Sequence, residues 1–314
     1  MHFRVDLLNK CWFLAGPTAC GKTSVGLALA NHLTAEIVSM DSMTIYRRMD
    51  IGTAKPSIPE QQRVPHHLID IVDPHQDFSV AEFLAAAECA CDQIMARGLT
   101  PLFVGGTGLY LRSILRGTFD GPGADWDFRR HMQQELSEHG AVAMFERLRI
   151  HDPKTAGRLH PNDHRRVIRA LEVIHLTGKP LSEQQRQEPL PADQRPRNVF
   201  WLRPPREWLY QRINDRVQTM LQNGLLEEVQ ALRAEEPQLS RTARQALGYR
   251  ELIDHLEGKL GYAEAITIIQ NRTRQFAKRQ HTWYRNLVEC LEFQIQAGET
   301  PADIAHRLLQ HAGA

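Results

Sequence analysis

The sequence predicts an α/β protein: a parallel sheet flanked by helices, with a small all-helical insertion and a helical C-terminal part. Three observations predict this. Short apolar segments of strand character alternate with helical patterns up to residue 116 and return near residue 198. A glycine-containing loop joins the first such segment to a helix. Residues 117–197 are instead polar and helical in pattern. We therefore expect a core made of residues 1–116 and 198–314, and a helical insertion domain at 117–197.

The loop that joins the first strand to the first helix carries a phosphate-binding pattern. It reads G-x-x-x-x-G-K-T and lies between the apolar segment Trp12–Ala15 and the helical segment Ser24–Leu33. Its glycines allow the backbone to wrap around an anion, so that N–H groups and the helix N-terminus point at phosphate oxygens. A P-loop core that binds a diphosphate or triphosphate is therefore predicted, with ligand contacts from Gly16, Pro17, Thr18, Ala19, Cys20, Gly21, Lys22 and Thr23.

Composition limits the classes of protein that fit. A chain of 314 residues that is 42% hydrophobic can bury a large core. Its net charge of +1 means that any nucleic-acid surface must be a local one. The five cysteines are odd in number and scattered, which is typical of reduced thiols in a cytosolic protein. The first ten residues lack a long apolar run, and we expect neither a signal peptide nor a membrane span.

Two further strands end in polar residues. The second strand, Glu36–Met40, runs into Asp41 and Ser42. Because parallel strands present their carboxyl ends at one crevice, Asp41 is expected beside the phosphate loop, although a turn cap explains Asp-Ser equally well. A later apolar strand, 101–104, ends in a glycine turn that places Thr107 beside the same crevice. The segment 49–56 between them is a polar loop that we expect to be mobile.

Two elements lie between these strands. The segment 66–73 is a third strand candidate, and its paired His66 and His67 point to opposite faces, which favours a structural role over a metal site. The stretch Ser79–Glu82 matches a capping box and predicts a helix that runs to about Arg97.

Basic residues mark the second half of the chain. An amphipathic helix over 207–222 contains Arg216. In the helix predicted for 262–285, Arg274, Lys278, His281 and Arg285 share one face, next to an apolar stripe of Phe276, Trp283 and Leu287. That basic face is either simply solvated or binds a polyanion.

Taken together, these motifs resemble those of the tRNA dimethylallyltransferases, also called isopentenyl-tRNA transferases. The segments that carry the resemblance occur in the family's order at 16–23, 41–46, 49–56, 65–68, 104–110, 169–173, 247–250 and 278–285. Cys20 stands where the family's loop usually has Ser, a position that contributes mainly its backbone N–H, so we expect little change beyond some thiol sensitivity. No zinc-finger pattern follows Arg285, which implies the bacterial form.

The resemblance implies an activity. Family members transfer the dimethylallyl group of dimethylallyl diphosphate to N6 of the adenosine 3′-adjacent to the anticodon, in tRNAs that read codons beginning with U. The implied cofactor is Mg²⁺ and the implied partner is the anticodon stem-loop, gripped in part by the insertion. We further expect a cytoplasmic monomer with no membrane association.

The resemblance also assigns roles to residues. Asp41 would be the general base, Thr107 would contact the adenine or the diphosphate, and Arg216 would act with Lys22 on the diphosphate, while Thr23 would hold the metal. The implied tRNA path comprises Asp41, Ser42, Met43, Thr44, Thr107, Arg129, Arg165, Arg166, Val167, Ile168, Arg169, Gln245, Ala246, Leu247, Gly248, Tyr249, Arg250, Lys278, Arg279, Gln280, His281, Thr282, Trp283, Tyr284 and Arg285.

Two other functions fit parts of the pattern. A P-loop kinase would use Asp41 as a base on a hydroxyl and consume ATP. A nucleotide-gated RNA-binding module would use the basic helix and form no covalent product. A diphosphate prenyl synthase of the Asp-rich, all-helical kind is excluded, because the chain has no D-D-x-x-D pattern.

Overall fold

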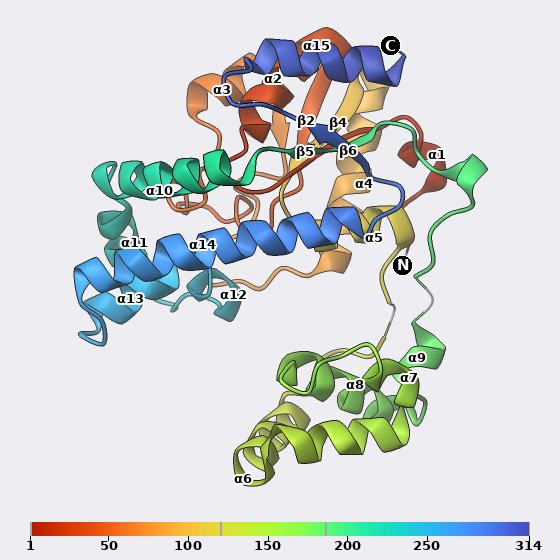
Figure 1. Cartoon of the computed structure of the whole chain (residues 1–314), viewed down its shortest axis with the longest axis vertical. Helices are drawn as coiled ribbons and strands as arrows, with labels where there is room; N and C mark the ends of the chain where they lie inside the picture. The colour runs from red at the N-terminus through yellow and green to blue at the C-terminus, as the bar shows by residue number, and fades with distance from the viewer. Residues whose placement is uncertain (1, 120, 186, 314) are drawn as a thin grey trace. The chain divides into compact units, whose positions relative to one another are not determined.

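The computed structural model describes residues 2–119, 121–185 and 187–313, which form two compact units. Residues 117–188 make up the helical unit, and the remainder makes up the larger unit, which contains the sheet (Figure 1). The observed second boundary, at 188, comes earlier than the 197 expected from sequence. The polar segment after it belongs to the larger unit because Leu190 packs against that unit's hydrophobic core.

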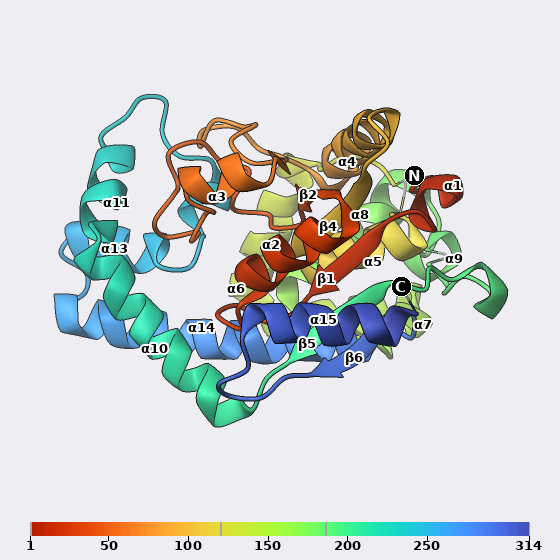
Figure 2. The same ribbon diagram turned by 90° about the horizontal axis from the view of Figure 1, so that it is seen from above.

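The larger unit is built on a six-stranded sheet in the order β3-β2-β4-β1-β5-β6, with every neighbouring pair parallel. The carboxyl ends of all six strands therefore lie at one edge, where ligands bind in folds of this class. Figure 2 shows the strands with helices on both faces. The strands are β1 (Trp12–Ala15), β2 (Ala35–Ser39), β3 (His66–His67), β4 (Thr100–Gly105), β5 (Val199–Arg203) and β6 (Leu291–Gln294).

The third strand is much shorter than the sequence suggested. We expected a strand over 66–73, but β3 contains only His66 and His67. Leu68 and Asp70 both have positive φ angles, 62° and 56°, which turn the chain out of the extended conformation. The chain rejoins the sheet region only through an isolated bridge between Tyr46 and Val72. Strand β6 was not anticipated at all.

Successive side chains of the central strands point to opposite faces of the sheet, and each face packs into its own hydrophobic core. Phe13 and Phe103 point into the core beneath α4 and α5, with their rings stacked 4.9 Å apart between centroids. Leu14 and Leu102 point to the opposite face, into the core that α2 and α15 cover. The helices of this unit are α1 (Val5–Leu8), α2 (Lys22–Leu33), α3 (Ile58–Arg63), α4 (Val80–Ala96), α5 (Gly108–Arg116), the 3₁₀ turn η1 (Ala192–Gln194), α10 (Arg206–Gln222), α11 (Leu225–Arg233), α12 (Arg241–Arg244), α13 (Tyr249–Leu256), α14 (Tyr262–Arg285) and α15 (Pro301–Ala312).

Several helix boundaries follow the local signals. The predicted capping box at the start of α4 is present, with the Ser79 hydroxyl accepting from the Glu82 amide at 3.2 Å and the Glu82 carboxylate accepting from the Ser79 amide at 2.7 Å. Helices α10 and α14 match the predicted segments within one residue. Among the described residues, no helix is long and apolar enough to cross a bilayer.

The segment 49–56 is firmly attached instead of mobile. The Glu228 carboxylate on α11 accepts hydrogen bonds from the backbone amides of Asp50, Ile51 and Gly52, at 2.8–3.2 Å. The same carboxylate accepts from the Tyr249 hydroxyl at 2.5 Å. A third hydrophobic core, which includes Met49 and Tyr249, lies beneath these contacts. The sequence could not show these contacts, because Glu228 and Tyr249 come from a distant part of the chain.

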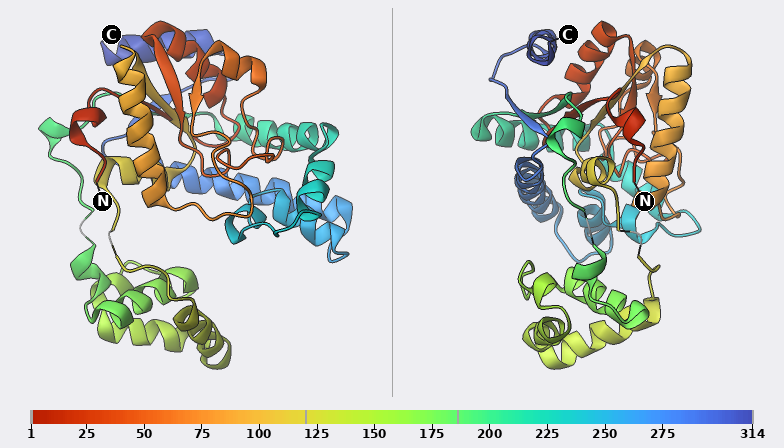
Figure 3. Two further views of the ribbon diagram at one scale, coloured as in Figure 1. Left: turned by 180° about the vertical axis from the view of Figure 1, so that it is seen from behind. Right: turned by 90° about the vertical axis from the view of Figure 1, so that its right-hand side faces the viewer.

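The helical unit, whose helices are drawn in Figure 3, has its own small hydrophobic core. Helix α6 (Trp126–His151) is interrupted at Gly140, whose φ of 79° is not helical. Helices α7 (Pro153–Ala156), α8 (His164–Thr177) and α9 (Leu181–Gln184) complete the unit. Met132, Leu148 and Val167 are fully buried in it. An independent core of this kind explains why the insertion folds as a separate unit.

Candidate active site

The phosphate loop adopts the strand–loop–helix arrangement that its sequence predicts. It leaves the buried strand β1 and enters α2 at Lys22. Gly21 caps the helix with a φ of 94°, a conformation that glycine adopts at no steric cost. No side chain caps this helix end, so the N–H groups of its first turn remain available to an anion.

Two cationic side chains face the loop. Lys22 donates from Nζ to the Pro17 carbonyl oxygen at 2.7 Å, and Arg216 approaches from α10. In the described part of the chain neither forms an ion pair with a carboxylate. Burial lowers the pKa of Lys22 and of Arg216, and the nearby Asp41 charge partly opposes the shift in each. Half-buried cations without counter-ions create a site where an anionic ligand is strongly favoured.

A cavity of about 530 Å³ lies in front of the loop. Its walls include Lys22, Thr23, Asp41, Gly106 and Arg216. A second cavity, of about 330 Å³, shares Asp41 and Arg216 with the first and is otherwise more apolar. Its further lining includes Met43, Thr107, Val217, Met220, Leu225, Leu247, Ile269 and Phe276. The arrangement gives a polar compartment for a charged group and a neighbouring apolar one, with a carboxylate and a guanidinium between them.

The β2 and β4 ends bring Asp41 and Thr107 together. Asp41 accepts the Met43 amide on Oδ1 at 2.9 Å, which is a turn-capping bond, while its Oδ2 forms no hydrogen bond with a described residue. Thr107 accepts the Ser42 amide at 3.0 Å. At Gly105 any side chain is excluded, since a Cβ there would lie 2.1 Å from the Met40 carbonyl oxygen. The two strand ends can approach each other only because that position is glycine.

Two residues of α14 fasten the phosphate loop to the β4 turn. The Gln280 side chain accepts the Thr18 amide at 2.8 Å and donates to the Gly106 carbonyl at 2.7 Å. The Tyr284 hydroxyl donates to the same carbonyl at 2.8 Å and lies 3.3 Å from the Gly16 carbonyl oxygen. Burial raises the pKa of Tyr284 well above its ordinary value, so the hydroxyl keeps its proton and remains a donor. Both side chains are buried.

The sequence-based prediction missed this arrangement, because it placed the apolar stripe at the larger residues of the helix. Phe276 and Trp283 are only half-buried, and the buried face runs through Ala277, Gln280 and Tyr284. The i, i+3, i+7 spacing of those three residues is the signal that could have identified it.

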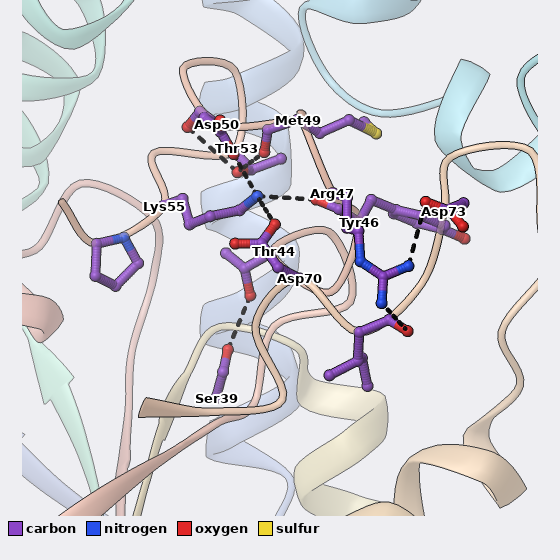
Figure 4. Close-up of polar contacts among 12 residues, drawn as sticks. Ser39, Thr44, Tyr46, Arg47, Met49, Asp50, Thr53, Lys55, Asp70 and Asp73 are labelled. Atoms are coloured by element: carbon purple, nitrogen blue, oxygen red, sulfur yellow. Dashed lines mark hydrogen bonds and ion pairs between the residues drawn. The ribbon is translucent and has the colours of Figure 1, made fainter. Parts of the chain in front are cut away.

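Lys55 lines one wall of the larger cavity, and its side chain is 4% exposed. Figure 4 shows its ammonium among Tyr46, Asp50 and Asp70. Its ammonium donates to the Tyr46 carbonyl at 2.8 Å and to Asp70 at 2.6 Å, and it also pairs with Asp50. Asp70 is therefore an ion-pair partner, not a free metal ligand. The pair of histidines is structural, as predicted: His67 bonds Glu36 at 2.6 Å and His66 bonds the Val64 carbonyl at 2.7 Å.

The predicted tRNA residues fall into distinct environments. Exposed are Arg165, Arg166, Gln245, Arg250, Lys278, Arg279, Thr282 and Arg285, and half-buried are Ser42, Met43, Leu247, His281 and Trp283. Thr44, Val167, Ile168, Ala246, Gly248, Tyr249, Gln280 and Tyr284 are buried. Their assignment to the tRNA path stays a prediction: Thr44 and Gln280 line the larger cavity, and Ala246 and Gly248 line the smaller one.

Two arginines of the helical unit also have internal partners. Glu172 is fully buried, and its carboxylate pairs with Arg129 at 2.8 Å and with Arg169. Burial opposes ionisation of Glu172, yet its hydrogen bonds with these arginines outweigh it and lower its pKa. Arg129 and Arg169 therefore hold the interior charge of this unit, and Arg165 and Arg166 are its exposed basic residues on α8.

Cys20 in the phosphate loop is buried, and burial raises the pKa of its thiol, which disfavours the thiol sensitivity expected from sequence. The other four cysteines are also free thiols, in agreement with the prediction of reduced cysteines.

Comparison with known proteins shows which family the chain belongs to. The family model described as IPP transferase matches residues 44–287. The chain belongs to this family. It is 47% identical over 283 residues to a tRNA dimethylallyltransferase of Syntrophobacter fumaroxidans, covering 90% of this chain and 82% of that one. It is 49% identical over 276 residues to one of Symbiobacterium thermophilum, covering 87% of this chain and 85% of that one.

Solved structures of the family share the whole fold. The tRNA isopentenylpyrophosphate transferase of Bacillus halodurans superposes with a TM-score of 0.70 at 39% identity, covering 97% of this chain and 96% of that one. A eukaryotic dimethylallyltransferase acting on tRNA gives a TM-score of 0.76 at 27% identity, covering 95% of this chain and 77% of that one. The chain is therefore a prenyltransferase of the tRNA dimethylallyltransferase family, with the P-loop core and parallel sheet that the sequence predicted.

Proposed function

We propose that this protein transfers the dimethylallyl group of dimethylallyl diphosphate to N6 of the adenosine 3′-adjacent to the anticodon, in tRNAs that read codons beginning with U, and releases diphosphate. The observation that carries the proposal is the convergence of the phosphate loop, Asp41, Thr107 and Arg216 on two adjoining cavities. Membership in the family supports the same reaction.

Departure of the diphosphate is the demanding step. Adenine N6 is a weak nucleophile because its lone pair is delocalised into the ring, so the allylic carbon must develop cationic character as the C1–O bond breaks. Negative charge then accumulates on the diphosphate, and Lys22, Arg216 and the loop amides are in place to stabilise it. Both cations are desolvated, which strengthens their interaction with a phosphate oxygen.

Asp41 is assigned the role of general base for the N6 proton. As the new N6–C1 bond forms, N6 loses a proton, and the Asp41 carboxylate accepts it through the oxygen that the Met43 amide does not occupy. Thr107, fixed by its bond to the Ser42 amide, faces the apolar compartment and contacts the adenine there. The bonds balance: N6–C1 forms, C1–O breaks, the diphosphate leaves and the proton passes to Asp41.

A divalent metal fits this site, and we propose Mg²⁺. Among the described residues, no group of three or more His, Cys, Asp and Glu side chains could enclose a metal ion. Thr23 and Asp41 nevertheless line the same cavity, and Mg²⁺ characteristically binds one or two protein oxygens together with substrate phosphates and waters. When bound, the ion would neutralise part of the diphosphate charge.

For tRNA, we propose contacts from the exposed members of the predicted path. Arg165 and Arg166 on the helical unit, and Lys278 and Arg285 on α14, are exposed. Such residues hold phosphates and set register, whereas few groups read bases. The target adenine must leave the anticodon-loop stack to reach the cavity. We further propose that the protein acts in the cytoplasm as a monomer.

Mass spectrometry of tRNA tests the reaction. Purified protein, Mg²⁺ and dimethylallyl diphosphate should add one five-carbon group to a single adenosine of a U-decoding tRNA in the absence of ATP. A tRNA transcript whose target adenosine is replaced by guanosine is the matched control and should remain unmodified. A phosphorylated product that requires ATP would support a kinase instead. Tight, nucleotide-dependent RNA binding without any covalent product would support a binding module.

A further inference from the structure

A third cavity, of about 750 Å³, lies away from the active site; we call it the β5–β6 groove. Its walls come from the carboxyl ends of β5 and β6, the start of α10 and one face of α14. Figure 2 shows α10 beginning where β5 ends. Among the described residues, none lines both this groove and either active-site cavity. Because every strand pair is parallel, the groove opens at the same edge of the sheet as the phosphate loop.

The groove is strongly cationic. Its lining includes five Lys and Arg side chains, namely Arg203, Arg206, Lys278, Arg285 and Arg307, against the single acidic residue Glu292. The chain as a whole has a net charge of only +1, so this concentration of positive charge is local. Local charge of one sign in a concave surface attracts a polyanion.

Most of this positive charge is not neutralised internally. Arg203 pairs with Glu292 at 2.6 Å, and Arg307 pairs with Glu299. Arg206, Lys278 and Arg285 form no ion pair in the part of the chain that the structure describes. Arg206 is instead held by stacking, with its guanidinium carbon 5.1 Å from the centroid of the Tyr210 ring.

His281 lies within this cationic lining. It lines the groove between Lys278 and Arg285 and packs edge-on to Trp201, with ring centroids 5.1 Å apart. Burial lowers its pKa, and the positive charges of Arg203 and Arg285 lower it further, while Glu292 opposes them.

We propose that the β5–β6 groove binds phosphodiester groups of the tRNA away from the reacting nucleotide, with Arg206 on one wall and Lys278 and Arg285 on the other. The inference rests on the proposed function and adds the β5–α10 turn to the RNA surface. The three unpaired cations are exposed and stand on two different elements. A single small anion in so open a site competes poorly with water, whereas an RNA backbone contacts several cations at once and releases their counter-ions.

The proposal is tested by measuring tRNA affinity against salt concentration for the full-length protein and for Arg206→Gln. One lost phosphate contact lowers the slope of log K against log salt by roughly 0.7–0.9 and, at about 0.1 M salt, raises the Kd by about fivefold to eightfold. Arg197→Gln is the matched control, because this exposed arginine lies just before the amino end of the same strand, β5, at the opposite edge of the sheet. It should leave both quantities unchanged.

A turnover measurement distinguishes an effect on tRNA binding from an effect on the chemical step. At saturating tRNA, the single-turnover rate of Arg206→Gln should equal that of the wild type, because the groove does not touch the reacting atoms. If Arg206→Gln matches Arg197→Gln in both Kd and salt slope, the inference is overturned. A raised Kd with an unchanged slope also overturns it, since the contact would not be to a phosphate. Loss of affinity for inorganic phosphate alone, with tRNA binding intact, would assign the groove to a small anion. If the wild-type protein modifies no tRNA, the proposed function fails, whereas the groove is still judged by the binding data.

Discussion

Replacing Gln280 should loosen the phosphate loop without affecting tRNA binding. In Gln280→Leu the side-chain volume is nearly kept, but the Thr18 amide loses its acceptor and the Gly106 carbonyl loses one of two donors. The bond to the part-buried Thr18 amide contributes about 0.5–1.5 kcal/mol, and the bond to the Gly106 carbonyl, which keeps its bond to Tyr284, contributes about 1 kcal/mol. We therefore expect the free energy of unfolding to fall by about 1.5–2.5 kcal/mol.

The functional consequence follows from what Gln280 joins. It connects the phosphate loop to the glycine turn after β4, so its loss should raise the KM for dimethylallyl diphosphate while the Kd for tRNA stays near wild type. Urea unfolding, steady-state kinetics and tRNA binding together measure the three quantities. Gln275→Leu is the matched control: it is the same change at an exposed position of the same helix and should alter none of them.

The opposite pattern would refute the reasoning. The family resemblance placed Gln280 within a segment that contacts tRNA. If Gln280→Leu weakens tRNA binding while stability and diphosphate handling are preserved, the side chain serves RNA directly and the observed bonds to the loop have little energetic weight.

Three further predictions concern the reacting groups. Asp41→Asn retains an oxygen that can accept the Met43 amide, so the melting temperature should hold while the single-turnover rate falls roughly 10²–10⁴-fold; an unchanged rate would reduce Asp41 to a turn cap. Arg216→Gln should weaken diphosphate binding or slow the chemical step with tRNA affinity intact, and a collapse of tRNA affinity alone would move Arg216 to the RNA surface. Because burial lowers the pKa of Lys22, its positive charge is lost as pH rises through a value below the ordinary lysine range. Affinity for dimethylallyl diphosphate should fall over that window, and Lys22→Arg should shift the fall to higher pH; identical profiles for the two proteins would exclude Lys22 as the titrating group.

Much of the candidate site could be predicted from the sequence, because its signals are local. The phosphate loop occupies eight contiguous residues, Gly16–Thr23, and its glycines, lysine and following helix are all within one short segment. Asp41 and Thr107 were recognisable because each directly follows an apolar strand, and parallel strands bring their carboxyl ends to one edge. The start of α4 was equally clear from its capping box.

Interactions between distant segments could not be read in this way. Gln280 bonds the Thr18 amide across 262 residues of sequence, and Glu228 holds the amide of Ile51 across 177. Lys55 belongs to a segment expected to be mobile, and its partners Tyr46, Asp50 and Asp70 are nearer in sequence but surround its ammonium only in the folded chain. Hydrogen bonds of this kind depend on the fold that brings the partners together, and no local pattern encodes them.

The sequence by itself thus determined the α/β class, the phosphate loop and the residues that end its strands, since periodicity and turn chemistry act over a few residues. Only the tertiary structure showed which basic residues have an internal charge partner. Arg129 and Arg169 neutralise the buried Glu172, whereas Arg206 and Lys278 remain exposed and unpaired among the described residues. The physical reason is that the ion pairs of a charged side chain depend on which groups surround it. Those groups come from different segments and are brought together only when the whole unit packs.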